Sequence, residues 1–127
     1  MHEMGIVVQL TRTLDEITKR EKIKKIGKVT VQVGEVSGVV DQFFYECWGY
    51  VKTNYPALAD SELVLEPMTA ITFCENCQKT YETMKYGKTC PYCKSGETYL
   101  VSGRECIIKE IEAEVDKDYD VKINKDN

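Results

Sequence analysis

The sequence predicts a fold that mixes helices with strands and carries a small inserted segment of a different character. Two stretches, residues 4–20 and 41–52, place apolar side chains at the three- and four-residue steps of an amphipathic helix. Four other stretches alternate apolar with polar residues, as half-buried strands do: 29–33, 63–66, 71–73 and 104–115. Before the last of these, residues 74–100 are polar and hold four of the six cysteines.

Each predicted element has local support. The apolar face of the first helix is formed by Val7, Leu10, Leu14 and Ile17. Positive charge at the end of this helix, on Lys19 and Arg20, suits the free carbonyl groups of a last turn. The second helix has an apolar face of Phe44, Cys47, Trp48 and Val51. Pro67 interrupts the second strand region, which predicts a bend or a sheet edge there. The charged tail, 116–127, is expected to be frayed.

Composition and charge narrow the class of protein. The 127 residues suffice for one modest hydrophobic core, and 43% hydrophobic with 30% charged residues is typical of a globular protein. No apolar run approaches the roughly 20 residues that cross a bilayer. The first residues lack the basic and apolar pattern of a signal peptide, so we expect a cytoplasmic protein. A net charge of −4 disfavours binding to nucleic acid through phosphate neutralisation.

Four cysteines have the spacing of a metal site. Two residues separate Cys74 from Cys77, and two separate Cys90 from Cys93, so a tight turn can direct each pair at one ion. Four sulfurs at about 2.3 Å from the ion are the closed arrangement of structural zinc, which leaves no position for water or substrate. Zinc binding contributes roughly 10–16 kcal/mol of apparent free energy, enough to order a segment without its own core. The charge of the centre would be partly offset by Lys79, Lys85, Lys88 and Lys94.

Other interpretations of the cysteines stay open at this point. A sulfur tetrahedron also suits iron, as in a rubredoxin-like centre, which would absorb visible light where zinc does not. Two disulfides or four unrelated buried thiols are the remaining alternatives. Cys47 and Cys106 are isolated, and we expect both to pack in the core as small apolar residues. With one histidine in the chain, no set of nucleophile, base and orienting group can be assembled, so no enzyme is predicted.

That histidine, His2, directly follows the first methionine and can form a chelate. We expect a free amine on Met1, which with the amide and one imidazole nitrogen of His2 gives three nitrogens in a plane, a geometry that suits Ni(II) or Cu(II). A fourth donor is available from Glu3. Alternatively, His2 is an ordinary surface or core residue and Glu3 a first-turn acid. Asp41, a candidate carboxylate for the same ion, is more simply the N-cap or first-turn acid of the second helix.

Taken together and in their order, these motifs resemble the HypA/HybF family of nickel metallochaperones for hydrogenase maturation. The resemblance runs from residue 1 to about residue 115. It is carried by 1–4, 33–40, the two Cys-x-x-Cys pairs, 101–105 and 108–112.

The resemblance implies an α+β nickel-binding domain of two helices packed on a three-stranded sheet, formed by 1–73 and 101–127, with a zinc ribbon, 74–100, inserted before the last strand. It also implies that His2 carries transient Ni(II) with help from Glu3, and that the four cysteines hold structural zinc. The implied partners are a HypB-type GTPase and the large subunit of [NiFe]-hydrogenase, and some members also serve urease. We expect a monomer or weak homodimer. The alternatives are a zinc-ribbon module for protein or nucleic-acid interaction and a small iron electron carrier.

Overall fold

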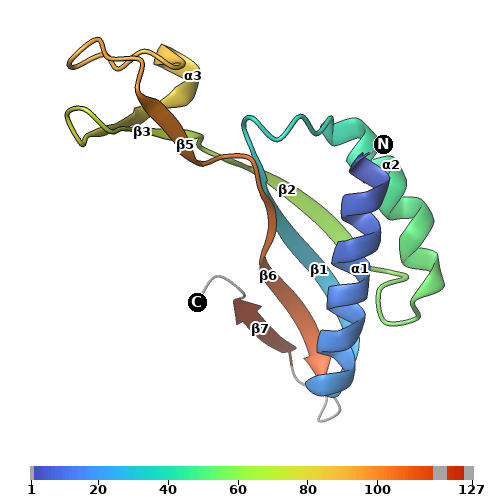
Figure 1. The fold of residues 1–127 in the computed structure, drawn as a ribbon. Coiled ribbons are helices and arrows are strands. Elements are labelled where there is room, and N and C mark those ends of the chain that lie inside the picture. The colour runs from blue at the N-terminus through green and yellow to red at the C-terminus, as the bar shows by residue number, and fades with distance from the viewer. Residues whose placement is uncertain (1, 116–119, 125–127) are drawn as a thin grey trace. The chain divides into compact units, whose positions relative to one another are not determined.

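The computed structural model describes residues 2–115 and 120–124, without the side chains of His2 and of 120–124. Its helical elements are α1 (His2–Arg20), α2 (Asp41–Val51), the short 3-10 helix η1 (Lys52–Asn54) and α3 (Thr83–Tyr86). Its strands are β1 (Ile23–Gly34), β2 (Glu62–Met68), β3 (Ile71–Cys74), β4 (Thr80–Glu82), β5 (Thr98–Ser102), β6 (Cys106–Val115) and β7 (Asp120–Asn124). They form a four-stranded sheet in the order β2-β1-β6-β7 and a three-stranded antiparallel sheet in the order β4-β3-β5 (Figure 1).

The chain divides into two compact units. The first unit consists of Met1–Gln32, Val39–Glu66 and Ile107–Asn127, and the second of Val33–Gly38 and Pro67–Cys106. The second unit is thus broader than the insertion 74–100 expected from the cysteine positions. The physical reason is that β3 begins at Ile71, ahead of the first cysteine, and that the segment 33–38 hydrogen-bonds to the backbone of Met68, Gly103 and Glu105.

In the first unit, α1 and α2 pack against each other and cover one face of the four-stranded sheet (Figure 1). All four residues of the predicted α1 face are buried, from Val7 and Leu14 at 0% exposed to Leu10 at 8%. The sheet contributes the buried β1 residues Ile26, Val29 and Val31, which close the core from the other side. The predicted α+β class, with two helices packed on a sheet, is confirmed. Among the described helices, none has the length and apolar character needed to cross a bilayer.

The sheet of the first unit has one more strand than expected. The tail was predicted to fray, and for residues 120–124 this prediction is wrong; residues 116–119 and 125–127 lie outside the described part of the chain. β7 pairs antiparallel with β6, placing Val121 opposite Ala113 and Ile123 opposite Ile111. Both β6 partners are buried. The two apolar residues of β7 therefore pair with core positions of β6, as the alternation of a strand requires.

Two expectations about single residues need correction. Cys47 and Cys106 were expected in the core, and both are only half-buried. Cys47 lies at the margin of the α2 face, where Phe44, Trp48 and Val51 are the buried residues. Cys106 is the first residue of β6, where the strand has just begun. By contrast, the prediction from Pro67 is confirmed, because β2 lies at an edge of its sheet.

Candidate metal centre

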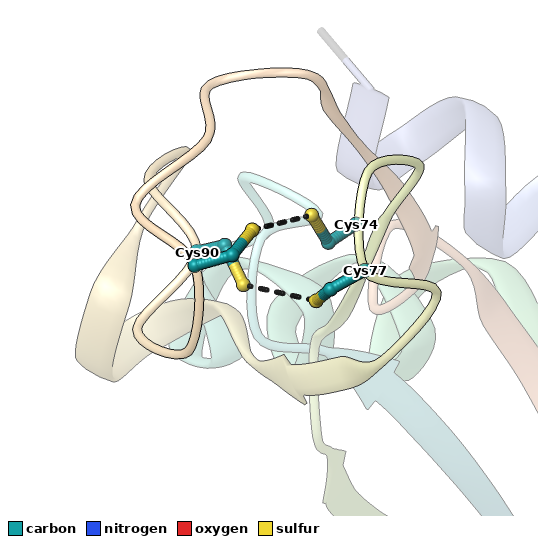
Figure 2. A group of neighbouring side chains, drawn as sticks. Cys74, Cys77 and Cys90 are labelled. Carbon is teal, nitrogen blue, oxygen red and sulfur yellow. Dashed lines mark hydrogen bonds between the residues drawn. The ribbon is translucent and has the colours of Figure 1, made fainter.

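The sulfur atoms of Cys74, Cys77, Cys90 and Cys93 all lie within 4.8 Å of one another. The Sγ atoms of Cys74 and Cys93 are 3.5 Å apart, and those of Cys77 and Cys90 are 3.6 Å apart (Figure 2). Sulfurs about 2.3 Å from a central ion, at the corners of a tetrahedron, are about 3.8 Å from each other. None of the four is in a disulfide. The donor set and its spacing therefore fit a four-sulfur metal ion.

The two Cys-x-x-Cys turns share one backbone geometry. In the first turn, the N–H of Cys74 donates to the carbonyl of Lys79 (2.9 Å), and the N–H of Gln78 donates back to the carbonyl of Cys74 (2.8 Å). The corresponding distances in the second turn, which starts at Cys90, are 3.0 and 2.9 Å. The residue after each second cysteine has a positive φ, 62° at Gln78 and 66° at Lys94. This left-handed residue reverses the chain, so that both sulfurs of each turn face the same point.

The surroundings of the four thiols are unequal. The Asn76 side-chain amide donates to the Cys93 sulfur at 3.3 Å and lowers the pKa of Cys93 to about 6. Burial opposes ionisation of Cys90, but the N–H groups of Cys93 and Tyr92 outweigh it and lower its pKa. At Cys77, burial raises the pKa to about 11. Because one thiol of the cluster has a raised pKa, all four cysteines ionise together only when a bound cation compensates their negative charge.

The rest of the second unit offers little core besides the sulfurs. Its buried cluster consists of Cys74, Tyr81 and Cys90, with Cys77 and Cys93 packed against it. The Tyr81 hydroxyl donates to the carbonyl of Gly87 at 2.8 Å, which satisfies its polar end. A core made mainly of thiols has little apolar area of its own, so an ion bound at its centre would be the main source of order.

Two of the lysines expected to offset the sulfur charge have other neighbours. The Lys79 Nζ lies 4.8 Å from the centroid of the Tyr92 ring, in a cation–π arrangement. Lys85 forms an ion pair with Glu82 at 3.6 Å on the exposed side of α3. Lys79 and Lys85 therefore still add positive charge to the second unit, but the contacts described for them are with Tyr92 and Glu82 and not with the thiols.

The predicted nickel ligands at the N-terminus are described only in part. Met1 lies outside the described residues, and His2 begins α1 without a described side chain. Glu3 is only 5% exposed, and its Oε2 accepts the N–H of Val40 at 3.0 Å. Asp41 is the exposed first residue of α2, whereas Val40 is the N-cap, so Asp41 is a first-turn acid. The start of α1 is therefore held beside the start of α2 (Figure 1).

The Glu3 contact replaces a missing capping group. Val40 has no side-chain oxygen to cap α2, and in a capping box its N–H would be accepted by a Glu or Gln three residues into the helix. That position is Phe43, which has no acceptor. Glu3 supplies the acceptor from the other helix, 37 residues away in sequence. This role of Glu3 could not be predicted from the sequence, because the local signal is only the absence of a capping side chain at Val40.

We expect Glu3→Ala to destabilise the protein by about 1–3 kcal/mol, because it leaves the Val40 N–H without an acceptor. Glu3→Gln is the matched control, since it keeps an acceptor oxygen and removes only the charge, and its cost is expected to be under about 1 kcal/mol. Urea unfolding of both variants measures the difference. Equal losses for the two variants would show that charge, and not the hydrogen bond, gives Glu3 its structural value.

Residues 33–38 and 101–105, which come from two segments that carried the family resemblance, have a structural role in the second unit. The N–H of Gly34 donates to the carbonyl of Glu105 at 2.8 Å, and Oε1 of Glu35 accepts the N–H of Ala70 at 2.7 Å. The Glu105 carboxylate accepts the N–H of Gly103, which lowers the pKa of Glu105. Both acids thus hold backbone turns, a role that spacing along the chain does not reveal.

Both the sequence and the fold of this chain are similar to those of known proteins. The chain is 32% identical over 118 residues to the hydrogenase maturation factor HypA of Wolinella succinogenes, covering 91% of this chain and 98% of that protein. It is 30% identical over 116 residues to HypA of Aquifex aeolicus, covering 91% and 100%. The fold matches the solution structure of the nickel metallochaperone HypA from Helicobacter pylori with a TM-score of 0.75 at 20% identity, covering 90% of this chain and 98% of that one.

A protein-family model also matches the chain. It is described as "Hydrogenase/urease nickel incorporation, metallochaperone, hypA", and it covers residues 1–113. These residues include the N-terminal segment, both helices, all four clustered cysteines and most of β6. The resemblance seen in the sequence is confirmed, and the chain belongs to the HypA family of nickel-incorporation metallochaperones.

Proposed function

We propose that this protein captures Ni(II) at its N-terminus and passes it on for insertion into the metal centre of a [NiFe]-hydrogenase. The observation that carries the proposal is the closed character of the four-cysteine cluster, with sulfurs 3.5 and 3.6 Å apart and all four corners filled by protein. Such a site holds an ion permanently and has no open position for exchange. A transferable ion therefore needs a second, open site, and family membership over residues 1–113 supports nickel as that ion.

The open site is the N-terminus itself. Ni(II) is bound there in a plane by three nitrogens: the Met1 amine, the His2 amide and one nitrogen of the His2 imidazole. Such planar nitrogen sites suit Ni(II). Glu3 is the candidate fourth donor, and its bond to the Val40 N–H supports a second role for it, fixing the start of α1 against α2. A site at a chain terminus has few protein atoms around it, so incoming ligands can replace its donors one at a time.

Zinc is the resident ion of the four cysteines in this proposal. Bound there, Zn(II) compensates the thiolate charge and orders the ribbon; the coordinating residues are Cys74, Cys77, Cys90 and Cys93. The functional division in this proposal follows the metals: 1–73 with 101–127 carries nickel, and 74–100 forms the ribbon, while 33–38, 67–73 and 101–106 belong to the compact unit that contains the ribbon. The absorption spectrum of the purified protein checks the ion, because zinc is colourless and an iron centre is not.

The recipients belong to the same proposal. A HypB-type GTPase is the partner in nickel transfer, the large subunit of [NiFe]-hydrogenase is the final acceptor, and urease maturation is a second route. The family description, which names both hydrogenase and urease, supports these partners as a class. We place this transfer in the cytoplasm, so the nickel ion passes from the N-terminal site to its recipient without crossing a membrane.

We expect His2→Ala to abolish stoichiometric nickel binding and to leave zinc content unchanged, because it removes the only imidazole of the chain. The protein is used without a tag, saturated with both ions and then dialysed. Metal analysis and the d–d spectrum of planar Ni(II) then measure what it has kept. Gln9→Ala is the matched control, since it changes an exposed α1 residue and leaves the N-terminal donors intact.

A second variant tests the amine. Extending the N-terminus by a short tag removes the free Met1 amine while His2 stays in place, so nickel binding should again be lost. Normal, stoichiometric nickel binding by the tagged protein would exclude the proposed ligand set.

A further inference from the structure

The second unit contains a groove of about 450 Å³ that neither metal site uses. This volume is within the roughly 300–1,000 Å³ range of small-molecule sites. Three threonines line it, Thr72 from β3, Thr83 from α3 and Thr98 from β5. The other lining residues that matter are two cations, Lys88 and Arg104, and the ring of Tyr99.

The threonine hydroxyls leave a donor available. The Oγ1 atoms of Thr72 and Thr83 are 2.6 Å apart, so one hydroxyl donates to the other. The hydroxyl that accepts still carries its own proton, and among the described residues it has no further acceptor. Thr72 is 3% exposed and Thr83 is half-buried, so the free proton of the pair has its access from the groove that both residues line. Thr98 differs, because its hydroxyl donates to the carbonyl of Lys88 at 2.8 Å. The pair therefore requires an acceptor oxygen from a bound molecule or water.

The charge of the groove has one sign. Lys88 and Arg104 line it, and none of the described acidic residues does. In the described part of the chain, neither cation has a carboxylate within salt-bridge distance. Arg104 does feel the neighbouring Glu105, whose carboxylate is already bound by the N–H of Gly103 at 3.0 Å. Two cations and a hydroxyl donor at one groove favour a ligand with several negative oxygens.

An aromatic wall completes the groove. Tyr99 is 53% exposed, and its ring packs on Phe73 with centroids 5.4 Å apart. A ring supported on one side and open on the other offers a face for a flat apolar group. Val36 and Leu100 add aliphatic surface beside it.

We propose that this groove binds a small molecule that carries a phosphate or carboxylate group next to a flat apolar part. The oxyanion is held by Lys88, Arg104 and the Thr72–Thr83 pair, and the apolar part lies against Tyr99. This is a ligand site separate from both metals, and it goes beyond the proposed nickel delivery, whose failure would leave it unaffected.

The test uses the zinc-loaded full-length protein and phenyl phosphate as the probe. We expect saturable changes in the amide NMR shifts of Thr72, Thr83, Leu100 and Arg104, and weaker or no changes with neutral benzyl alcohol. Benzoate separates the two oxyanion sources. Binding of benzoate as tight as that of phenyl phosphate supports the proposal with a carboxylate ligand, and tighter binding of phenyl phosphate supports it with a phosphate ligand.

Matched variants distinguish the groove from general attraction. Arg104→Gln should weaken phenyl phosphate binding about tenfold. Lys25→Gln, which removes the same charge from β1 of the first unit, should leave it unchanged. Thr83→Val should weaken binding about threefold or more, whereas Thr80→Val, on exposed β4, should not. Equal weakening by Arg104→Gln and Lys25→Gln, shifts outside the groove, or benzyl alcohol binding as well as the anion would overturn the proposal.

Discussion

Removing the ion from the four-cysteine cluster is expected to unfold the β4-β3-β5 sheet. The buried apolar residues of the second unit are few, namely the cluster of Cys74, Tyr81 and Cys90 together with Val33 and Ala70, so its apolar burial is small. Structural zinc contributes about 10–16 kcal/mol of apparent free energy to such a segment, comparable to the whole stability of a typical domain, about 5–15 kcal/mol. Without a cation, Cys77, with its pKa raised by burial to about 11, stays protonated at neutral pH, and four thiolates cannot coexist.

Amide hydrogen exchange before and after chelation measures this effect strand by strand. Protection in β3 and β5 should fall to the level of an unfolded chain, and adding zinc should restore it. Cys90→Ser should have the same outcome without a chelator, with metal content falling from about one ion per chain to near zero. Cys47→Ser, a half-buried cysteine outside the cluster, is the matched control and should keep its metal. Full protection in β3 after chelation would mean that the sheet folds on other contacts.

The second large effect is expected from Gly34→Ala, which should cost about 2–4 kcal/mol of folding free energy. A Cβ at this position would lie 2.0 Å from the carbonyl oxygen of Gly103 and 2.2 Å from its carbonyl carbon. Both are backbone atoms, so no side-chain rotation relieves the overlap. Separating the two backbone segments would also break the hydrogen bond from the N–H of Gly34 to the carbonyl of Glu105, which is 2.8 Å long.

Gly49→Ala is the matched control for that substitution. Gly49 lies inside α2, and an added Cβ would meet no atom within 4 Å. Alanine in a helix interior is favoured over glycine by roughly 0.5–1 kcal/mol, so this variant should gain stability. Urea unfolding of the two alanine variants should therefore move the midpoint in opposite directions. A neutral result for Gly34→Ala would show that the two backbones can separate without loss.

The helices and the cysteine cluster could be predicted because their signals are local. The apolar face of α1 repeats within four residues, and each Cys-x-x-Cys turn needs only the residues between its cysteines. β7 was missed because the tail around it is highly charged and its five residues include just two apolar ones, Val121 and Ile123. Their strand character depends on the pairing with Ala113 and Ile111, which only the folded sheet supplies.

Burial at the margins of elements escaped prediction for a related reason. A helical pattern places Cys47 within about one residue step of the buried face, but the width of that face is set by what packs on it. The groove at Thr72, Thr83 and Arg104 escaped as well, since its residues are spread over more than thirty positions and share no spacing rule. A candidate ligand site of this kind becomes visible only when three separate segments have been brought together.

By itself, the amino-acid order determined the helical faces, the cluster of four cysteines and the donor atoms proposed for nickel at the N-terminus, because periodicity and chelation act over a few residues. Only the tertiary structure decided that the Glu3 carboxylate accepts the N–H of Val40, that Glu35 and Glu105 hold backbone turns, and that β7 joins the sheet. These contacts join groups whose proximity is set by the packing of whole elements. A carboxylate is an equally good partner for an N–H or a metal ion, so its role depends on which of them the fold places beside it.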